Sequence, residues 1–177
     1  MSLLAEEVVE EWLNRQGYFT IRGIKLGVHE IDLLAIKKSA EGTTECRHIE
    51  VQVSMRPVSY ITQVPRELQR TGRSPNSARR SLDELGIGVS EWVEKKYHHP
   101  DKVRLRESLW PGDWSYEFVA HVVKSEDELS LIASHGIKVI RFSDVVSSLT
   151  SKHALFSSAC GGDIVELVHM GITDKRQ

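Results

Sequence analysis

The first apolar positions of the chain recur with the period of a helix. In residues 3–16 they return every three or four places, which is typical of a helix that buries one face. These positions are Ala5, Val8, Val9, Trp12 and Leu13. Gly17 follows them, where a helix commonly ends in a left-handed cap. The pattern therefore predicts an opening helix that packs against the rest of the fold.

The period then shortens to that of β-strands. Residues 18–24, 30–36 and 48–53 are rich in strand-forming side chains. The segment 39–45 between the second and third stretches is polar and contains a glycine, as a hairpin loop should. The sequence thus predicts three consecutive strands, the last two of them paired as a hairpin.

A helical segment is predicted to follow, at about 57–110. Helices are expected at 59–70, at 77–85 before Gly86, and at 90–97 before Pro100. The Trp-Pro-Gly-Asp-Trp run at 110–114 has the composition of a turn. This segment separates the hairpin from the next strand-forming stretch, so we interpret it as an insertion.

A strand, a helix and a second strand are predicted near the end. Residues 116–123 and 137–142 are strand-like, and Ser125 with Glu128 three places later has the spacing of a helix capping box. Gly136 closes that helix, and Ser143 begins another. A strand, helix and strand at this spacing form a parallel crossover unit. The fold class is therefore α/β, with a central mixed sheet flanked by helices in the order αβββαβ and one domain over 1–177.

Composition limits the class of protein without identifying it. Of 177 residues, 40% are hydrophobic and 27% charged, which is ordinary for a soluble domain. No apolar run reaches the roughly 20 residues that cross a bilayer, and the start lacks the basic segment of a signal peptide. We therefore expect a cytoplasmic protein with no membrane partner. Two cysteines far apart in the chain predict neither a zinc site nor a disulfide framework.

Two acidic residues stand where a buried strand would normally carry aliphatic side chains. Because side chains alternate along a strand, Glu50 and Gln52 share one face while Ile49 and Val51 lie on the other, apolar face. Asp32 lies inside the otherwise apolar strand 30–36, across the predicted hairpin from Glu50. Two neighbouring carboxylates repel each other unless a cation lies between them, and oxygen ligands suit Mg²⁺. A salt bridge at the sheet edge is the alternative for either acid.

The opening helix adds further acids beside its apolar face. Glu6 lies at the edge of that face, and Glu10 follows one turn later on the same side. From either position a carboxylate could reach the sheet edge, although an exposed helical glutamate is the more common case.

In this order the pieces resemble the PD-(D/E)xK nuclease superfamily, and the Holliday-junction-resolvase-like proteins in particular. The resemblance rests on a helix glutamate, Gly17-Tyr18-Phe19, the run His29–Ala35 and the run His48–Val53, and covers residues 5–54. It implies a restriction-endonuclease-like core. The spacing from the helix glutamate to the Gly-aromatic pair selects Glu6 over Glu10.

The resemblance implies a role for each matched residue. Asp32 and Glu50 would coordinate Mg²⁺ or Mn²⁺, Glu6 would hold the metal directly or through water, and the Val51 carbonyl would be a further ligand. The metal would lower the pKa of a bound water that attacks a phosphodiester bond, without a covalent enzyme intermediate. The implied activity is that of a metal-dependent endonuclease acting on DNA, and the implied assembly, by analogy, is a homodimer.

One position departs from the family pattern. Gln52 stands where the family has a lysine, and an amide can orient water or phosphate but carries no charge. Some members of the superfamily resemble this chain in having glutamine there. Others place the lysine on a neighbouring element, for which Lys25, Lys37 and Lys38 are candidates here. The departure keeps open a second hypothesis, a catalytically degenerate module that binds nucleic acid or a partner protein.

A basic stretch follows the strand that carries Glu50. Its six arginines against one acid give +5, whereas the whole chain has a net charge of −2. They are Arg56, Arg66, Arg70, Arg73, Arg79 and Arg80. Near the site they would bind backbone phosphates with little sequence preference. A solvated basic surface is the alternative interpretation. A small-molecule α/β enzyme has little support, because the sequence contains no glycine-rich phosphate loop or nucleophile elbow.

Overall fold

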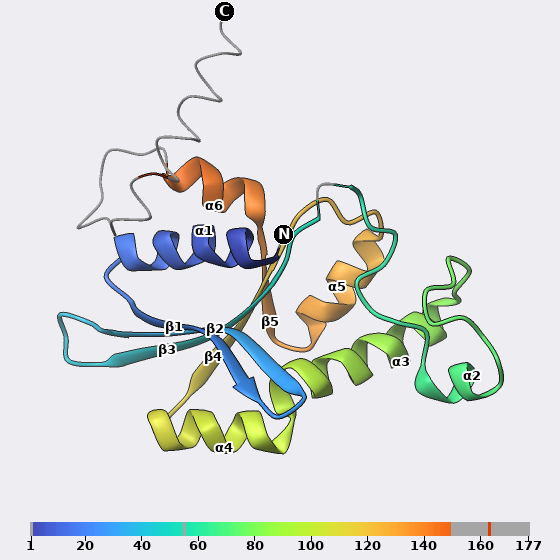
Figure 1. The fold of residues 1–177 in the computed structure, drawn as a ribbon, viewed down its shortest axis with the longest axis horizontal. Helices are drawn as coiled ribbons and strands as arrows, with labels where there is room; N and C mark the ends of the chain where they lie inside the picture. Colours follow the sequence, from blue (N-terminus) through green and yellow to red (C-terminus); the bar gives the residue numbers. More distant parts are fainter. Residues whose placement is uncertain (1, 55, 150–162, 164–177) are drawn as a thin grey trace, which may run out of the picture.

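A five-stranded mixed sheet forms the centre of the protein. The computed structural model describes residues 2–54, 56–149 and 163 (Figure 1). The strands lie side by side in chain order: β1 Phe19–Leu26, β2 His29–Lys38, β3 Thr44–Gln52, β4 Trp114–Ala120 and β5 Ile137–Arg141. β1, β2 and β3 are antiparallel, and β3, β4 and β5 are parallel. The predicted α/β class, the hairpin and the later parallel crossover are confirmed, and the layout is compatible with a restriction-endonuclease-like fold.

Helices cover both faces of this sheet (Figure 1). α1 (Ser2–Arg15) and α6 (Phe142–Leu149) lie on one face. α3 (Leu82–Val93), the π-helical turn η1 (Glu94–His98), α4 (Pro100–Leu109) and α5 (Glu126–Ser134) lie on the other. We call these the α1 face and the α4 face. A helical stretch on each side lets the sheet bury both of its surfaces.

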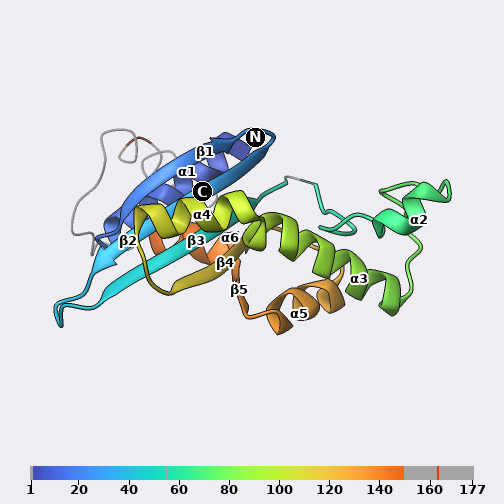
Figure 2. The ribbon, with the colours of Figure 1, turned by 90° about the horizontal axis from the view of Figure 1, so that it is seen from below.

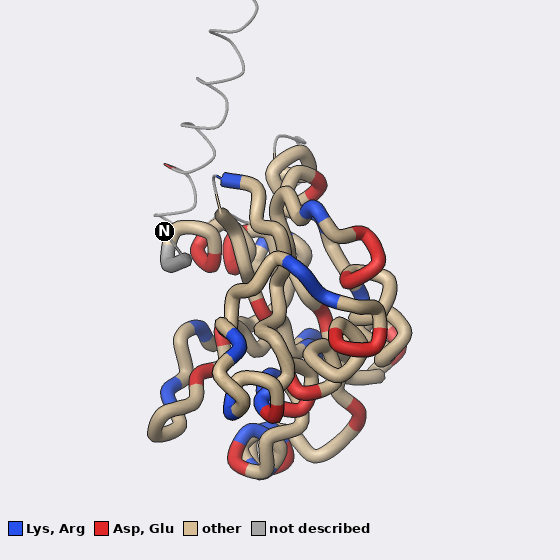
Figure 3. Tube along the Cα trace, turned by 90° about the vertical axis from the view of Figure 1, so that its right-hand side faces the viewer, with Lys and Arg blue, Asp and Glu red and all other residues tan. Residues whose placement is uncertain are grey.

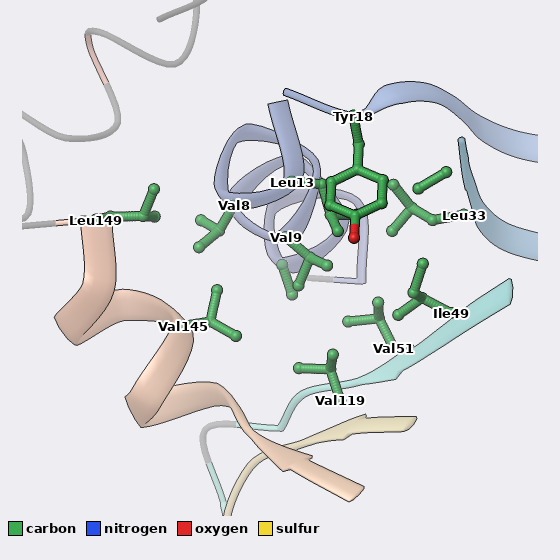
Figure 4. Packing of buried hydrophobic residues seen from close by; sticks show 12 residues of the cluster. Val8, Val9, Leu13, Tyr18, Leu33, Ile49, Val51, Val119, Val145 and Leu149 are labelled. Atoms are coloured by element: carbon green, nitrogen blue, oxygen red, sulfur yellow. The ribbon is translucent and has the colours of Figure 1, made fainter. Parts of the chain in front are cut away.

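The α1 face has an apolar core built from the predicted helix stripe and the alternate positions of the strands. Val9 and Leu13 of α1 pack with Leu33, Ile49 and Val119, and all five are fully buried (Figure 4). A second cluster on the α4 face centres on the buried rings of Tyr97 and Phe118. The sheet therefore separates two cores.

The inserted segment differs from its sequence-based prediction. Only α2 (Arg66–Arg70) is helical within the expected 59–70 helix, and residues before it form an extended loop. α3 starts at a Ser81–Glu84 capping box and continues through Gly86, which was expected to end a helix. α4 lies within the predicted helical segment 57–110, but no individual helix was predicted at its position. α2 and the start of α3 extend well beyond the sheet (Figure 2).

The helix α5 shows how tertiary contacts override a local motif. The Ser125 hydroxyl accepts a hydrogen bond from the Glu128 N–H, as predicted. The Glu128 carboxylate, however, accepts bonds from the Ile61 and Thr62 N–H groups and from the Thr62 hydroxyl, 2.6–2.9 Å away. It is fully buried. Half of the expected capping box is therefore replaced by an anchor for the loop before α2.

Cys46 is buried with a free thiol, and Cys160 lies outside the described residues. Within the described ranges, no helix is both long and apolar enough to cross a membrane.

Candidate active site

The site begins where β2 and β3 separate. Their pairing runs as far as Leu33 opposite Ile49, and the next residue of β2 is Asp32. Its Oδ2 accepts a hydrogen bond from the Val51 N–H at 2.8 Å, so a carboxylate takes the place of the next backbone partner. The N–H and C=O of one strand residue point to the same side. The Val51 carbonyl is therefore also directed toward β2 and Asp32.

Glu50 lies on the α4 face of β3 and is only 1% exposed. Its Oε1 is 3.0 Å from both His48 Nε2 and Lys102 Nζ, and its Oε2 is 2.5 Å from Lys96 Nζ. Three nitrogen atoms thus surround one buried carboxylate. Asp32 and Glu50 converge on this side of the sheet, as the hairpin prediction required.

The protonation of His48 follows from its second neighbour. Arg106 Nη1 lies 2.8 Å from His48 Nδ1. Because a guanidinium only donates, Nδ1 must accept, and Nε2 must then carry the proton donated to Glu50. Burial, together with the nearby Arg106 and Lys102 charges, lowers the pKa of His48 to about 4 against the opposing effect of Glu50. His48 is therefore a neutral link between Arg106 and Glu50.

Asp32 and Glu50 differ sharply in how they bind protons. Burial, followed by the charge of Glu50, raises the pKa of Asp32 to about 7. Burial would also raise the pKa of Glu50, but the His48 hydrogen bond and the charges of Lys96 and Lys102 hold it at about 2. Two buried carboxylates with divergent pKa values are a common feature of functional sites.

Glu6 of α1 is close enough to the acid pair to interact with it electrostatically, since its charge contributes to the raised pKa of Asp32 and the charge of Glu50 contributes to its own. It is 6% exposed, and burial, followed by the charge of Glu30, raises its pKa. Glu10, the alternative position, is bound by Arg22 (2.9 Å) and Thr20 (3.0 Å), and the choice of Glu6 stays a prediction. Across the described part of the chain, no group of three or more His, Cys, Asp or Glu side chains is placed to hold one metal ion.

The expected substitutes for the family lysine are misplaced. Lys25 and Lys38 are exposed, and Lys37 lies over the ring of Tyr18. The lysines at the site are instead Lys96 of η1 and Lys102 of α4. Sequence reasoning missed both, because two lysines about 50 positions from Glu50 in a polar helical stretch carry no signal that distinguishes them from surface residues. Gln52 is partly buried at the end of β3.

The basic stretch is divided between structural and exposed arginines. Arg73 pairs with Glu84, and Arg80 lies over the Tyr60 ring and donates to the Thr62 carbonyl at 2.7 Å. Arg66 lies 3.9 Å from Glu91. The remaining members are exposed: Arg56, Arg70 and Arg79. Basic and acidic positions alternate over this side of the molecule (Figure 3). The chain on this side therefore carries both kinds of charge rather than basic residues alone.

Comparison with known proteins gives only distant likenesses. No protein-family model matches the chain, and no curated protein matches it. A crystal structure described as a protein of unknown function, AF1548, is similar with a TM-score of 0.43 and 15% identity over 80% of this chain. The MspJI restriction endonuclease in complex with a 27-mer oligonucleotide is similar with a TM-score of 0.39 and 13% identity over 94% of this chain. The chain spans 58% and 30% of the lengths of those two chains.

Proposed function

We propose that this protein is a divalent-metal-dependent endonuclease that hydrolyses phosphodiester bonds in DNA. The observation that carries the proposal is the convergence of Asp32 and Glu50 at the point where β2 and β3 separate. Both carboxylates are buried, and each is held in place by hydrogen bonds. A buried charged group of this kind is costly to a fold that does not use it.

The donor atoms fit Mg²⁺ or Mn²⁺. Mg²⁺ sites commonly use only one or two carboxylates and keep several water ligands. Asp32, Glu50 and the Val51 carbonyl would supply such a set, and Glu6 would contribute directly or through water. Each Glu50 oxygen has two lone pairs. Among the described residues, Oε1 bonds His48 and Lys102, whereas Oε2 bonds Lys96 alone. Oε2 is thus the Glu50 oxygen with a lone pair left for a metal ion. A metal bound there would supply a water of lowered pKa for attack on phosphorus.

The protein groups divide the remaining tasks. The ammonium group of Lys96 could neutralise charge on the phosphate. This is the role of the family lysine that Gln52 replaces. The Gln52 amide can orient the attacking water by hydrogen bonds. Lys102 and His48 fix the Glu50 rotamer from the side that faces away from Lys96, so we assign them a positioning role.

A second candidate is a non-catalytic module of the same fold that binds nucleic acid or a partner protein. The observation in its favour is that Glu50 is already neutralised by Lys96 and Lys102. In such a module the ion cluster would be purely structural, and Gln52 would reflect the loss of catalysis.

The test compares wild type with Asp32→Asn on supercoiled plasmid, branched DNA and single strands, each with Mg²⁺ or Mn²⁺. We expect wild-type cleavage and a loss of about 100-fold or more in the variant, because removal of one charge-stabilising group has that order of effect. Asp113→Asn is the matched control, since Asp113 is exposed in the turn before β4. The control should cleave like wild type.

The outcome also separates the two candidates. If wild type and Asp32→Asn are equally inert on all three substrates while both bind DNA, the enzyme is excluded and the binding module remains. Binding is measured by fluorescence anisotropy in EDTA, so that it does not depend on cleavage.

A further inference from the structure

A cavity adjoins the candidate active site on the side of the insertion. It has a volume of about 230 Å³ and lies between α2, α3 and the loop before α2. Lys96 forms part of its wall, and the Nζ atom of that lysine is 2.5 Å from Glu50 Oε2. Lys96 is therefore shared by the wall of the cavity and the candidate active site. Anything bound in the cavity would lie next to a phosphate bound at Asp32 and Glu50.

The walls of the cavity are held in place by two features of the fold. A Cβ atom on Gly88 of α3 would come within 2.7 Å of the Gln63 carbonyl oxygen, so only glycine lets the loop approach the helix this closely. On the far side of the loop, the buried Glu128 carboxylate fixes Ile61 and Thr62. The loop is thus tied to two helices in the free protein, which lowers the entropy cost of binding.

Three of the side chains that line the cavity match the parts of a nucleotide. The Trp92 ring is fixed by edge-on contacts with Tyr97 and Phe118, at ring-centre distances of 5.8 and 5.0 Å. The Gln63 amide can donate to and accept from a base edge, and Lys95 adds an exposed cation for a phosphate. Aromatic stacking, amide hydrogen bonds and a cation together are the usual means of binding an unpaired nucleotide.

We propose that this cavity holds one unpaired nucleotide of the DNA strand, next to the phosphate that is cut. This deepens the proposed function and rests on it. At about 230 Å³ the cavity is below the roughly 300–1,000 Å³ of sites for drug-sized ligands, so it suits a single base rather than a larger group. A base inside a duplex cannot enter, because its faces and pairing edge are covered. The substrate class is therefore DNA with a single-stranded or extruded nucleotide at the cut.

The test measures binding in EDTA, so that no strand is cut. A short oligodeoxynucleotide carrying the fluorescent base 2-aminopurine is titrated with protein, as a single strand and within a duplex. We expect strong quenching for the single strand only, because the base stacks in the cavity. Gln63→Ala and Lys95→Gln should each weaken single-strand binding about tenfold, or 1.4 kcal/mol, and change duplex binding less than twofold. Lys138→Gln, an exposed lysine of β5, is the matched control.

Each result bears on the proposal. Equal losses for single strand and duplex, or no loss in either variant, would overturn the nucleotide site. The nucleotide site would also be overturned if a free 2-aminopurine mononucleotide were quenched as strongly as the single-stranded oligodeoxynucleotide. Selective loss in the variants supports the cavity even if wild type never cuts DNA, and cleavage without any single-strand preference supports the nuclease but not the cavity. Both variants change exposed side chains, and a common thermal unfolding midpoint confirms that they fold.

Discussion

The two faces of β3 bury side chains of opposite character. On the α1 face, Ile49 and Val51 pack among aliphatic side chains from α1 and β2. On the α4 face of the same strand, His48 and Glu50 are equally buried but contact charged groups. Residues one position apart thus lie in an apolar core and in an ionic one. The apolar face needs only volume and shape, whereas the ionic face needs every partner.

This difference bears on the proposed function of the α4 face. Replacing a buried ion cluster by apolar residues of similar size is often neutral or stabilising, so burial of Glu50 is poor evidence for stability. Lys102 is fully buried and Arg106 nearly so. Lysine and arginine are rarely buried unless they are paired, so these two belong to the same ion cluster as Glu50. Their presence together on one face is what the proposed function would require. Substitutions on the ionic face and on the apolar face of the sheet test this contrast.

The largest effect on stability should come from Lys102→Met. Lys102 is 1% exposed and donates to Glu50 and to the Lys96 carbonyl, at 3.0 and 2.8 Å. Methionine keeps the unbranched chain but leaves both acceptors short of a donor. We expect the free energy of unfolding to fall by about 3–5 kcal/mol, measured by urea denaturation.

A double mutant sharpens this prediction. In a Glu50→Gln background, Lys102→Met should be much less destabilising, because the buried negative charge is gone. Exposed Glu41→Gln in the hairpin loop is the control background and should leave the full cost in place. Additive effects of Lys102→Met and Glu50→Gln would show that the cluster is not a coupled unit.

The next effect should come from Gly88→Ala on the same side of the sheet. The added Cβ would stand 2.7 Å from the Gln63 carbonyl, a backbone atom that cannot turn away. We expect a loss of about 1–3 kcal/mol in unfolding free energy, the usual cost of overpacking. Gly86→Ala, two positions earlier in α3, is the matched control and should be neutral or stabilising, because its added Cβ would meet no described atom within 4 Å outside its chain neighbours and the helix backbone. Equal behaviour of the two variants would contradict the close approach.

The sequence predicted the sheet and its acid pair because both depend on local patterns. Alternation along 30–36 and 48–53 determines which side chains share a face, and the hairpin places Asp32 near Glu50. The strand, helix and strand at the end of the chain likewise predicted that β4 and β5 are parallel. These features needed no knowledge of distant contacts.

The insertion was harder, and so were the cations of the site. Gly86 resembles a helix end by composition, yet α3 continues because Leu85 and Val89 bury against the core. Lys96 and Lys102 reach Glu50 only through the packing of η1 and α4 over β3. A contact between residues some 50 positions apart is set by tertiary structure, and no local pattern in the sequence specifies it.

Ile49→Val tests the apolar side of the comparison with a smaller effect. Ile49 is fully buried in the α1-face core, so loss of one methyl group should cost about 0.5–1.5 kcal/mol in unfolding free energy. Cleavage and DNA affinity should stay unchanged, measured at a temperature well below unfolding. A selective loss of cleavage would show that the two faces are not independent.

The smallest stability effect is expected for Arg56→Gln, which separates the two kinds of arginine in the basic stretch. Arg56 is exposed and follows β3 closely, so its loss should change the unfolding free energy by less than about 0.5 kcal/mol. If it binds a phosphate, the slope of log affinity for DNA against log salt should become shallower by about one. Arg80→Gln should instead lower the unfolding free energy and leave the salt slope unchanged, because Arg80 contacts the Tyr60 ring and donates to the Thr62 carbonyl. An unchanged salt slope in Arg56→Gln would leave that residue on a merely solvated surface, and the phosphate contacts would then have to come from Arg70, Arg79 or the lysines beside Glu50.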